Sequence, residues 1–407
     1  MSNALSHLTV LDLSRVLAGP WAGQVLADLG AEVIKVERPG AGDDTRGWGP
    51  PFLRDAEGKD STDAAYYLCA NRSKKSVTVD FTTAEGQSIV RQLARKSDVV
   101  LENFKVGGLK PYGLDHETLR AADPRLIYCS ITGFGQTGPY APRAGYDLLV
   151  QAMGGLMSIT GRRDDEPGAG PQKAGVAVTD ILTGLYATIG ILAALSHRDR
   201  TGLGQHIDLG LLDVQVACLA NQAMNYLVAG SAPRRSGNAH PNLVPYQDFP
   251  TSDGYMIIAV GTDAQFVKLC AAMNLTQLAD DPRFATNKQR VVNRGRLIEI
   301  LSGASRAHPT AHWVAALESV GVPAGPINSL DAVFDDPQVR ARDMRFELPH
   351  PIAGSVSLVA NPLRLSETPV SYRWAPPPLG AHTQEVLAQQ LSMTPAQIDA
   401  LRAKGVI

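Results

Sequence analysis

One aspartate stands in a stretch that is otherwise apolar and rich in small residues. Asp180 follows the run Gly175-Val176-Ala177-Val178-Thr179 and stands in the first turn of a predicted helix over residues 178–197. Its carboxylate could cap the free amides of that helix, which is the structural interpretation. It could also serve as a nucleophile, because a helix N-terminus stabilises the ionised form. The two interpretations are compatible, and the nearby glycines would let a ligand approach.

A glycine-rich loop is the second candidate. Residues 133–138 read GFGQTG, which matches the GxGxxG pattern of dinucleotide-binding folds after a predicted strand. In those folds the loop follows the first strand and opens a helix. Here Pro139 and Pro142 follow, and the loop comes after a later strand. We therefore expect a glycine loop whose backbone approaches another group closely, not a nicotinamide site.

The sequence gives less support to a metal site or a cysteine nucleophile than to the two candidates above. His308 and His312 are four residues apart, but Pro309 stands where a zinc protease carries glutamate. Cys129 lies inside an apolar run and is interpreted as a small core residue. The four cysteines have no paired metal spacing, which is typical of reduced thiols. The sequence predicts no metal site.

Basic residues gather near the ends of predicted strands. Lys35 and Arg38 follow the second strand, and Arg72, Lys74 and Lys75 precede the third. They could form a solvated charged rim. They could also supplement helix N-termini at a phosphate site, since ligands of a parallel sheet bind at the carboxyl ends of its strands.

The elements that must position these groups alternate between strand and helix patterns. Strands separated by helical stretches imply a doubly wound parallel sheet of the α/β class. A loop from 39 to 63 is too long for a simple connection and is interpreted as functional. The predicted strands cover residues 8–13, 32–36, 76–80, 99–102 and 126–131, with a helix over 83–95.

Length and composition set the domain organisation. A chain of 407 residues suggests two domains, and its composition changes near residue 230. We expect a large domain over 1–229, a smaller α+β domain over 230–325, and a segment over 326–407 that returns to the large domain.

Overall charge and hydropathy exclude several classes of protein. The formal net charge is -2, which gives no basic excess for nucleic acid. The apolar stretch 176–195 contains Asp180 and several polar residues, which favours a buried helix over a membrane span. The N-terminus lacks the pattern of a secretory signal. We expect a cytoplasmic protein without membrane or nucleic-acid partners.

Ordered motifs along the whole chain resemble the class III CoA-transferases, the formyl-CoA and carnitine CoA-transferase family. The sequence is most similar to the succinyl-CoA:glutarate CoA-transferase branch, which shares GDDTR, RAGYD and VPYQ. The motifs are LDLSRVLAGP (11–20), LGAEVIKVER (29–38), GDDTR (42–46), ENF (102–104), TGFGQTGP (132–139), GVAVTD (175–180) and GPIN (325–328).

This resemblance implies a fold, a reaction and an assembly. The family has a Rossmann-like large domain and a smaller domain, and two ring-like chains interlock as a homodimer. Asp180 matches the catalytic aspartate, which would form a mixed anhydride and then an aspartyl-CoA thioester. Gly135 and Gln136 belong to the loop near the reacting thioester. No cofactor is implied, since the CoA thioester is a substrate.

The resemblance also implies the ligand contacts. Acyl-CoA and small carboxylic acids, most of all dicarboxylates such as succinate and glutarate, are the expected partners. A second carboxylate needs a cationic partner, for which Arg46, Arg143 and His240 are candidates. The positions that match the CoA site are Val16, Ala18, Arg38, Asn103, Phe104 and Lys110.

Two other functions remain open on the sequence. An alpha-methylacyl-CoA racemase would use a histidine in a GHD motif, but this chain has Gly145-Tyr146-Asp147. Tyrosine, with a pKa of about 10, is a poor base near neutral pH. A non-catalytic acyl-CoA-binding protein would bind the thioester without exchange, and replacement of Asp180 would leave its function intact.

Overall fold

The computed structural model describes residues 3–407, which divide into two compact units. The first unit comprises the chain up to Leu156, Ala174–Val228 and Gln338–Ile407. The second comprises Met157–Lys173 and Ala229–Pro337. The small domain expected over 230–325 lies within this second unit, which also takes in an earlier segment and extends further towards the C-terminus.

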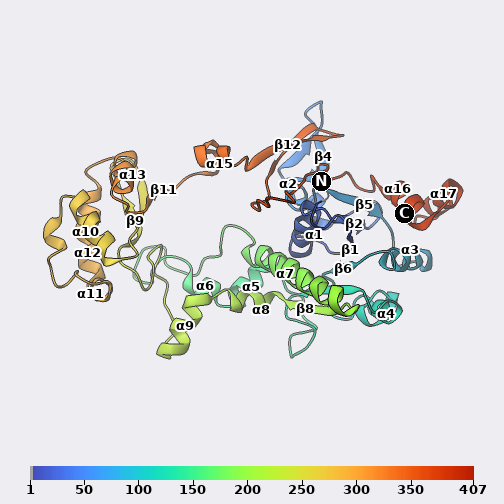
Figure 1. The fold of residues 1–407 in the computed structure, drawn as a ribbon, viewed down its shortest axis with the longest axis horizontal. Helices are drawn as coiled ribbons and strands as arrows, with labels where there is room; N and C mark the ends of the chain where they lie inside the picture. Colours follow the sequence, from blue (N-terminus) through green and yellow to red (C-terminus); the bar gives the residue numbers. More distant parts are fainter. Residues whose placement is uncertain (1–2) are drawn as a thin grey trace. The chain divides into compact units, whose positions relative to one another are not determined.

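The first unit is built on a six-stranded parallel sheet (Figure 1). The chain fills one half of the sheet outward from β1, returns to the centre, and then fills the other half. The strand order therefore reverses between β1 and β6, and ligands bind beside such a reversal at the carboxyl ends of the strands. The prediction of an α/β fold with a parallel sheet is confirmed. In spatial order the strands are β5 (Lys74–Thr78), β2 (Glu32–Glu37), β1 (Thr9–Asp12), β6 (Val99–Glu102), β7 (Ile127–Thr132) and β8 (His206–Gly210).

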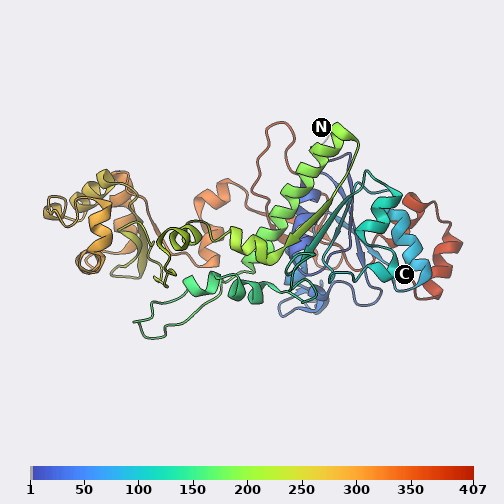
Figure 2. The ribbon, with the colours of Figure 1, turned by 90° about the horizontal axis from the view of Figure 1, so that it is seen from below.

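Apolar side chains cover both faces of this sheet. Leu11 and Ile34 point into one core with α3, α4 and the C-terminal helices, whereas Val10 and Val33 point into the other with α1 and α7. Alternation along a strand sends successive residues to opposite faces, so a sheet covered on both sides needs apolar residues throughout. Figure 2 shows the long helix α7 along one side of the sheet. The helices are α1 (Ala18–Asp28), α3 (Ala84–Ala94), α4 (His116–Ala122), α7 (Val178–Thr201), α16 (Thr383–Leu391) and α17 (Pro395–Ala403).

Local side chains set several helix ends. The Thr83 hydroxyl accepts the Gly86 N–H at the start of α3, and Thr394 and Gln397 form a reciprocal capping box on α17. Gly202 ends α7 in the left-handed conformation, with φ 76°.

Shorter elements complete the first unit. The expected long loop contains the turn Asp44–Gly47 and a hairpin that leads into α2, and a second hairpin packs against Tyr67 and Leu68. These elements are β3 (Phe52–Arg54), β4 (Asp60–Ala64), α2 (Ala65–Leu68), α5 (Asp147–Met153), α8 (Leu211–Ala217), β12 (Arg345–His350) and β13 (Gly354–Val359). Three further helices lie where the chain passes between the units, namely α6 (Leu156–Ile159), α9 (Ala220–Ala229) and α15 (Pro337–Ala341).

The second unit has its own core around a three-stranded antiparallel sheet. Phe249, Met256 and Phe266 are fully buried there, and Trp313 is nearly so. The unit is thus of the α+β type that the sequence predicted. Its elements are β9 (Tyr246–Pro250), β10 (Tyr255–Ala259), β11 (Ala324–Pro326), α10 (Asp263–Ala272), α11 (Asn287–Val292), α12 (Arg294–Ser305), α13 (Thr310–Ser319) and α14 (Leu330–Asp335).

Helix α7 has an unusual distribution of apolar residues. Within the described residues it is the one helix that is long and apolar enough to cross a membrane by length and composition alone. Half of its most apolar 18-residue stretch is buried inside the protein. Its inner face packs on α1 and on β7. Leu185, Ile189 and Leu192 form an exposed apolar stripe at helical spacing on its other side.

Candidate active site

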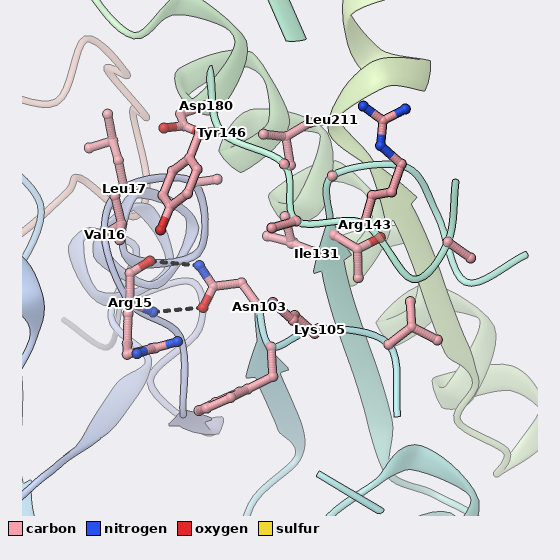
Figure 3. A pocket seen from close by; sticks show the side chains of 18 of the residues that line it. Arg15, Val16, Leu17, Asn103, Lys105, Ile131, Arg143, Tyr146, Asp180 and Leu211 are labelled. Atoms are coloured by element: carbon pink, nitrogen blue, oxygen red, sulfur yellow. Dashed lines mark hydrogen bonds between the residues drawn. The ribbon is translucent and has the colours of Figure 1, made fainter. Parts of the chain in front are cut away.

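A cavity of about 180 Å³ opens at the carboxyl ends of β1, β6 and β7, beside the reversal of strand order (Figure 3). Each strand contributes the loop that follows it, and α7 contributes Asp180 from its first turn. The cavity is lined by Arg15 from the loop after β1, by Asn103 from the loop after β6 and by Tyr146 from the loop after β7. The cavity thus lies where a parallel sheet of this order binds ligands.

Asp180 is buried in this cavity, with an exposed fraction of 9%. In the described part of the chain, no donor forms a hydrogen bond with its carboxylate, so both oxygens are available to a ligand. Burial, together with the nearby charge of Asp147, raises the pKa of Asp180 to about 7. The cap interpretation is therefore wrong for the Asp180 side chain. A poorly solvated carboxylate without internal partners has the environment of a nucleophile.

Asp147 performs the capping instead. Its Oδ1 accepts the N–H groups of Thr179 and Asp180 at 2.8 and 3.3 Å, and its Oδ2 accepts Gln151 Nε2 at 2.6 Å. The Thr179 hydroxyl donates to Gln215 Oε1 on α8 at 2.6 Å. Two other helices therefore hold the first turn of α7 in place. Sequence reasoning missed the capping role of Asp147, because the amides that it caps on α7 lie more than 30 residues away.

The glycine loop brings Asp147 into place. A Cβ atom at Gly133 would lie 2.6 Å from the Cα atom of Gly145, so neither position leaves room for a side chain where the two backbones meet. The prediction of a close backbone approach is confirmed. No helix opens at the end of this loop, because the next helix, α5, begins at Asp147.

The predicted catalytic roles of Gly135 and Gln136 find no support in this geometry. The Gly135 N–H donates to Thr132 Oγ1 at 2.9 Å, and the Gln136 N–H donates to the Asp208 carboxylate at 3.0 and 3.1 Å. Neither residue lines the cavity that holds Asp180. Their amides already have partners, so they are not poised to stabilise an oxyanion there.

A second cavity, of about 290 Å³, adjoins the first. Arg15, Asp44 and Phe104 line both. Phe81 contacts Phe104 and Tyr112 edge to face, with ring centroids 5.8 and 5.5 Å apart. An aromatic wall is therefore joined to the cavity of Asp180, which suits an elongated ligand with an aromatic end and a reactive end.

The predicted CoA contacts divide between the two cavities. Val16, Ala18 and Asn103 line the first, and Arg38 lines the second. Phe104 lines both, as described above. Lys110 lines neither, and its ammonium forms an exposed ion pair with Glu117 at 3.2 Å. Arg15 was not predicted, although it immediately precedes Val16 and its guanidinium lies 4.9 Å from the Phe104 ring centroid.

The basic residues near the strand ends mostly serve the interior. Lys35 forms an ion pair with Asp43, Lys74 with Asp12, and Arg72 with Asp28. All six side chains are buried, so neither a solvated rim nor a phosphate site describes them. Of the five basic residues that the sequence placed near these strand ends, Arg38 alone is exposed, and Lys75 is half-buried.

Arg46 likewise belongs to the interior. Its guanidinium donates two hydrogen bonds to the Glu37 carboxylate, both at 2.8 Å. It also donates to the Asp63 carboxylate at 2.7 Å and to the Tyr67 hydroxyl at 2.6 Å. With 3% of its surface exposed, it cannot reach a substrate carboxylate. The predicted substrate role of Arg46 is therefore corrected to a structural one.

The other two candidates for carboxylate recognition differ. Arg143 lines the first cavity, where its guanidinium lies 4.5 Å from the Tyr140 ring centroid, and in the described residues it has no carboxylate partner. His240 belongs to the second unit, where its Nδ1 accepts the N–H groups of Asn242 and Leu243 at 3.1 Å. Its substrate role stays a prediction.

Tyr146 occupies the position where a racemase would carry its catalytic histidine, and it lines the cavity of Asp180 (Figure 3). No histidine is among the described residues that line either cavity. Residues 3–407 also contain no cluster of three or more histidine, cysteine or acidic side chains that could hold a metal ion.

Comparisons with known proteins point to one family. The sequence matches CoA-transferase family III over residues 5–383. A succinate–glutarate CoA-transferase of Agrobacterium fabrum is 54% identical over 385 residues, 95% of each chain. A succinyl-CoA:glutarate CoA-transferase of Homo sapiens is 45% identical over 403 residues, 99% of this chain and 90% of the human protein. The crystal structure of a CaiB/BaiF family protein from Brucella suis is similar with a TM-score of 0.84 and 51% identity, over 96% of this chain and all of that one.

Proposed function

The chain belongs to CoA-transferase family III, and on this basis we propose that it exchanges coenzyme A between succinyl-CoA and glutarate. It is an enzyme that transfers CoA. The observation that carries the proposed chemistry is the Asp180 carboxylate, which is buried, has no hydrogen-bond partner in the described residues and faces a cavity that continues into an aromatic-walled one.

The reaction proceeds by four acyl transfers on one side chain. The Asp180 carboxylate attacks the thioester carbonyl of succinyl-CoA. The CoA thiolate departs, and a mixed anhydride of succinate and Asp180 forms. The thiolate attacks the aspartyl carbonyl, succinate departs, and an aspartyl-CoA thioester remains. Glutarate attacks that thioester to form a new anhydride, and the thiolate then takes the glutaryl group and restores Asp180. The covalent intermediates divide one difficult exchange into easier steps.

The two cavities divide the CoA thioester between them. The nucleotide end occupies the second cavity, with Arg38 near its phosphates and aromatic rings beside the adenine. The pantetheine arm passes Arg15 and Phe104, which line both cavities, and the thioester reaches Asp180. The N-terminus of α1, which has no side-chain cap, reaches the first cavity at Ala18. Its free amides are our candidates for the oxyanion site, in place of Gly135.

Arg143 is our candidate for the second carboxylate of the dicarboxylic substrates. It lines the cavity of the nucleophile and has no acidic partner in the described residues, so its guanidinium is free to bind a carboxylate in bidentate fashion. This recognition would favour succinate and glutarate over monocarboxylic acids of equal length.

We further infer a homodimer of interlocked, ring-like chains, each with a Rossmann-like large domain. The strand order of the six-stranded sheet supports the Rossmann-like description. The exposed apolar stripe of α7, with Leu185, Ile189 and Leu192, supports burial by a second copy of the chain.

No cofactor is needed, because carboxylates and a thiolate carry every step of the exchange. Four free cysteines support a reducing compartment, and we propose the cytoplasm. Acyl-CoA and small acids are then the partners, and neither nucleic acid nor a membrane is one.

The racemase alternative lacks its base. Proton abstraction would fall to Tyr146, whose phenol is a poor base near neutral pH. A non-catalytic acyl-CoA-binding protein would have no use for an unpaired, buried carboxylate at the reactive end of the site.

The function is tested by incubating the enzyme with succinyl-CoA and a panel of acids, followed by mass detection of new CoA esters. We expect glutaryl-CoA from the natural chain and none from Asp180→Ala. Intact-protein mass spectrometry with succinyl-CoA should reveal a CoA adduct that Asp180→Ala lacks. Exchange that survives Asp180→Ala would overturn the mechanism, and activity confined to monocarboxylates would overturn the substrate assignment.

A further inference from the structure

The loop between β1 and α1 contains a strained residue. Val16 has φ 70°, a left-handed conformation that β-branched residues rarely adopt because Cβ crowds the backbone. Glycine would adopt it without that penalty. Val16 lines the cavity of Asp180, so the strain lies at the wall of the proposed active site. Such a conformation persists only where the surroundings hold it.

Asn103 holds one side of this loop. Its Oδ1 accepts the Arg15 N–H at 2.8 Å, and its Nδ2 donates to the Arg15 carbonyl at 2.6 Å (Figure 3). The side-chain amide therefore pairs with both backbone groups of Arg15, as a neighbouring strand would. This reciprocal pair fixes the peptide groups on each side of Arg15, including the one that leads into Val16.

Asp43 holds the other side. Its Oδ1 accepts the Val16 N–H at 3.2 Å and the Thr45 N–H at 3.0 Å. Its Oδ2 forms a buried ion pair with Lys35 Nζ at 2.8 Å, and the same ammonium donates to the Ser14 carbonyl at 2.8 Å. Burial alone would raise the pKa of Asp43, but Lys35 and the Thr45 donors lower it to about 2. The carboxylate thus stays ionised and fixed.

The loop forms the boundary between the two cavities. The Arg15 side chain lines both, and Val16 lines only the cavity of Asp180. A shift of this loop would alter the passage through which the pantetheine arm runs, while leaving Asp180 on its own helix.

We propose that Asn103 and Asp43 are positioning residues that clamp the backbone of Arg15 and Val16. The clamp holds Val16 in its left-handed conformation and fixes the wall where the acyl end of a CoA thioester meets its nucleotide end. Asn103 then acts on the ligand through this loop. The identity of the ligand rests on the proposed function, whereas the clamp itself rests on the hydrogen bonds of the loop.

The test is a double-mutant cycle between Asn103→Ala and Val16→Gly. Asn103 is half-buried and outside the ion-pair network, so its replacement leaves the fold intact. We expect Asn103→Ala to raise KM for succinyl-CoA about tenfold or more, with a much smaller change in kcat. Because glycine needs no clamp to adopt positive φ, Val16→Gly should restore most of that loss, so that the double variant lies within about threefold of Val16→Gly alone.

Val106→Gly is the matched control. Val106 lines the same cavity, but its φ is not positive, so this substitution removes a side chain from the wall without relieving strain. We expect no rescue of Asn103→Ala by Val106→Gly. The clamp would be overturned if the increases in KM of Val16→Gly and Asn103→Ala simply multiplied in the double variant. It would also be overturned if Val16→Gly and Val106→Gly rescued Asn103→Ala equally.

The same cycle in melting temperature, and in calorimetric titration with free coenzyme A, separates the two proposals. If the natural chain binds CoA but does not transfer it, the proposed function is refuted. The double-mutant cycle in melting temperature and CoA affinity would still test the clamp. Recovery of melting temperature by Val16→Gly in the Asn103→Ala background is expected. Independent effects on both melting temperature and CoA affinity would refute the clamp.

Discussion

Asp147 Oδ1 lies 3.3 Å from the backbone nitrogen of Asp180 and accepts its N–H. The acid that caps the helix of Asp180 therefore comes from α5 and not from α7 itself. This arrangement leaves the Asp180 carboxylate without an internal partner and places a second negative charge near it. Of the two roles that the sequence offered for Asp180, capping falls to Asp147, and the role of nucleophile stays the one proposed for Asp180.

Replacement of Asp180 should stabilise the protein at alkaline pH. The folded-state pKa of Asp180, about 7, lies above its ordinary value of 3.8, so the folded state binds the proton more tightly than the unfolded state. Ionisation therefore costs stability progressively as pH rises from 4 to 7. We expect Asp180→Asn to be more stable than the natural chain by about 1–3 kcal/mol at pH 8, and by much less at pH 5. Thermal unfolding at both pH values measures this, and an equal difference at both would contradict it.

The rate should depend on the ionisation of Asp180. Because only the carboxylate attacks, kcat/KM for succinyl-CoA should rise with pH to a plateau above about 7. Asp147→Asn removes the neighbouring charge but keeps an oxygen that can cap α7, so we expect the midpoint of the profile to move to lower pH. Asp147→Ala, which also loses the cap, should in addition cost about 1 kcal/mol of stability. An unchanged midpoint in Asp147→Asn would exclude the electrostatic coupling.

Arg143 should determine the preference for dicarboxylates. Arg143 lines the cavity, and its side chain has no acidic partner in the described residues. Arg143→Ala is expected to raise KM for glutarate by about 10–100-fold, because a charge-assisted bidentate pair is lost. KM for a monocarboxylic acid of the same length should hardly change. Arg143→Lys, which keeps the charge but not the planar fork, should give an intermediate value. Parallel losses for both classes of acid would show that Arg143 does not select the substrate.

Arg46 should matter for stability and not for specificity. Its removal leaves the buried carboxylates of Glu37 and Asp63 without their cation. We expect Arg46→Met to lower the free energy of unfolding by about 3 kcal/mol or more, measured by denaturant titration. At low temperature the folded variant should keep the ratio of KM values for glutarate and a monocarboxylic acid. A changed ratio with unchanged stability would restore the substrate role that the sequence suggested.

The sequence predicted the elements of the large unit closely. The strand expected over 99–102 is β6, and the helix expected over 83–95 is α3 at Ala84–Ala94. Hydrophobic period, caps and glycines are local signals, and they determine local structure. The order of motifs predicted the family, and Asp180, the single acid in its apolar stretch, was predicted to be the nucleophile.

Which polar groups face the ligand was decided only by the tertiary structure. Arg46 was a candidate for substrate binding and Lys35 for a phosphate site, yet each is buried against an acid, Glu37 and Asp43 respectively. Asp147 meets α7 across more than 30 residues, and Asn103 meets Arg15 across 88. A side chain's charge and type can be read from the sequence, but its burial and partners depend on segments that the fold brings together. That is why the sequence alone could single out Asp180 as the proposed nucleophile, whereas only the folded chain separated residues that line the cavities from internal ones.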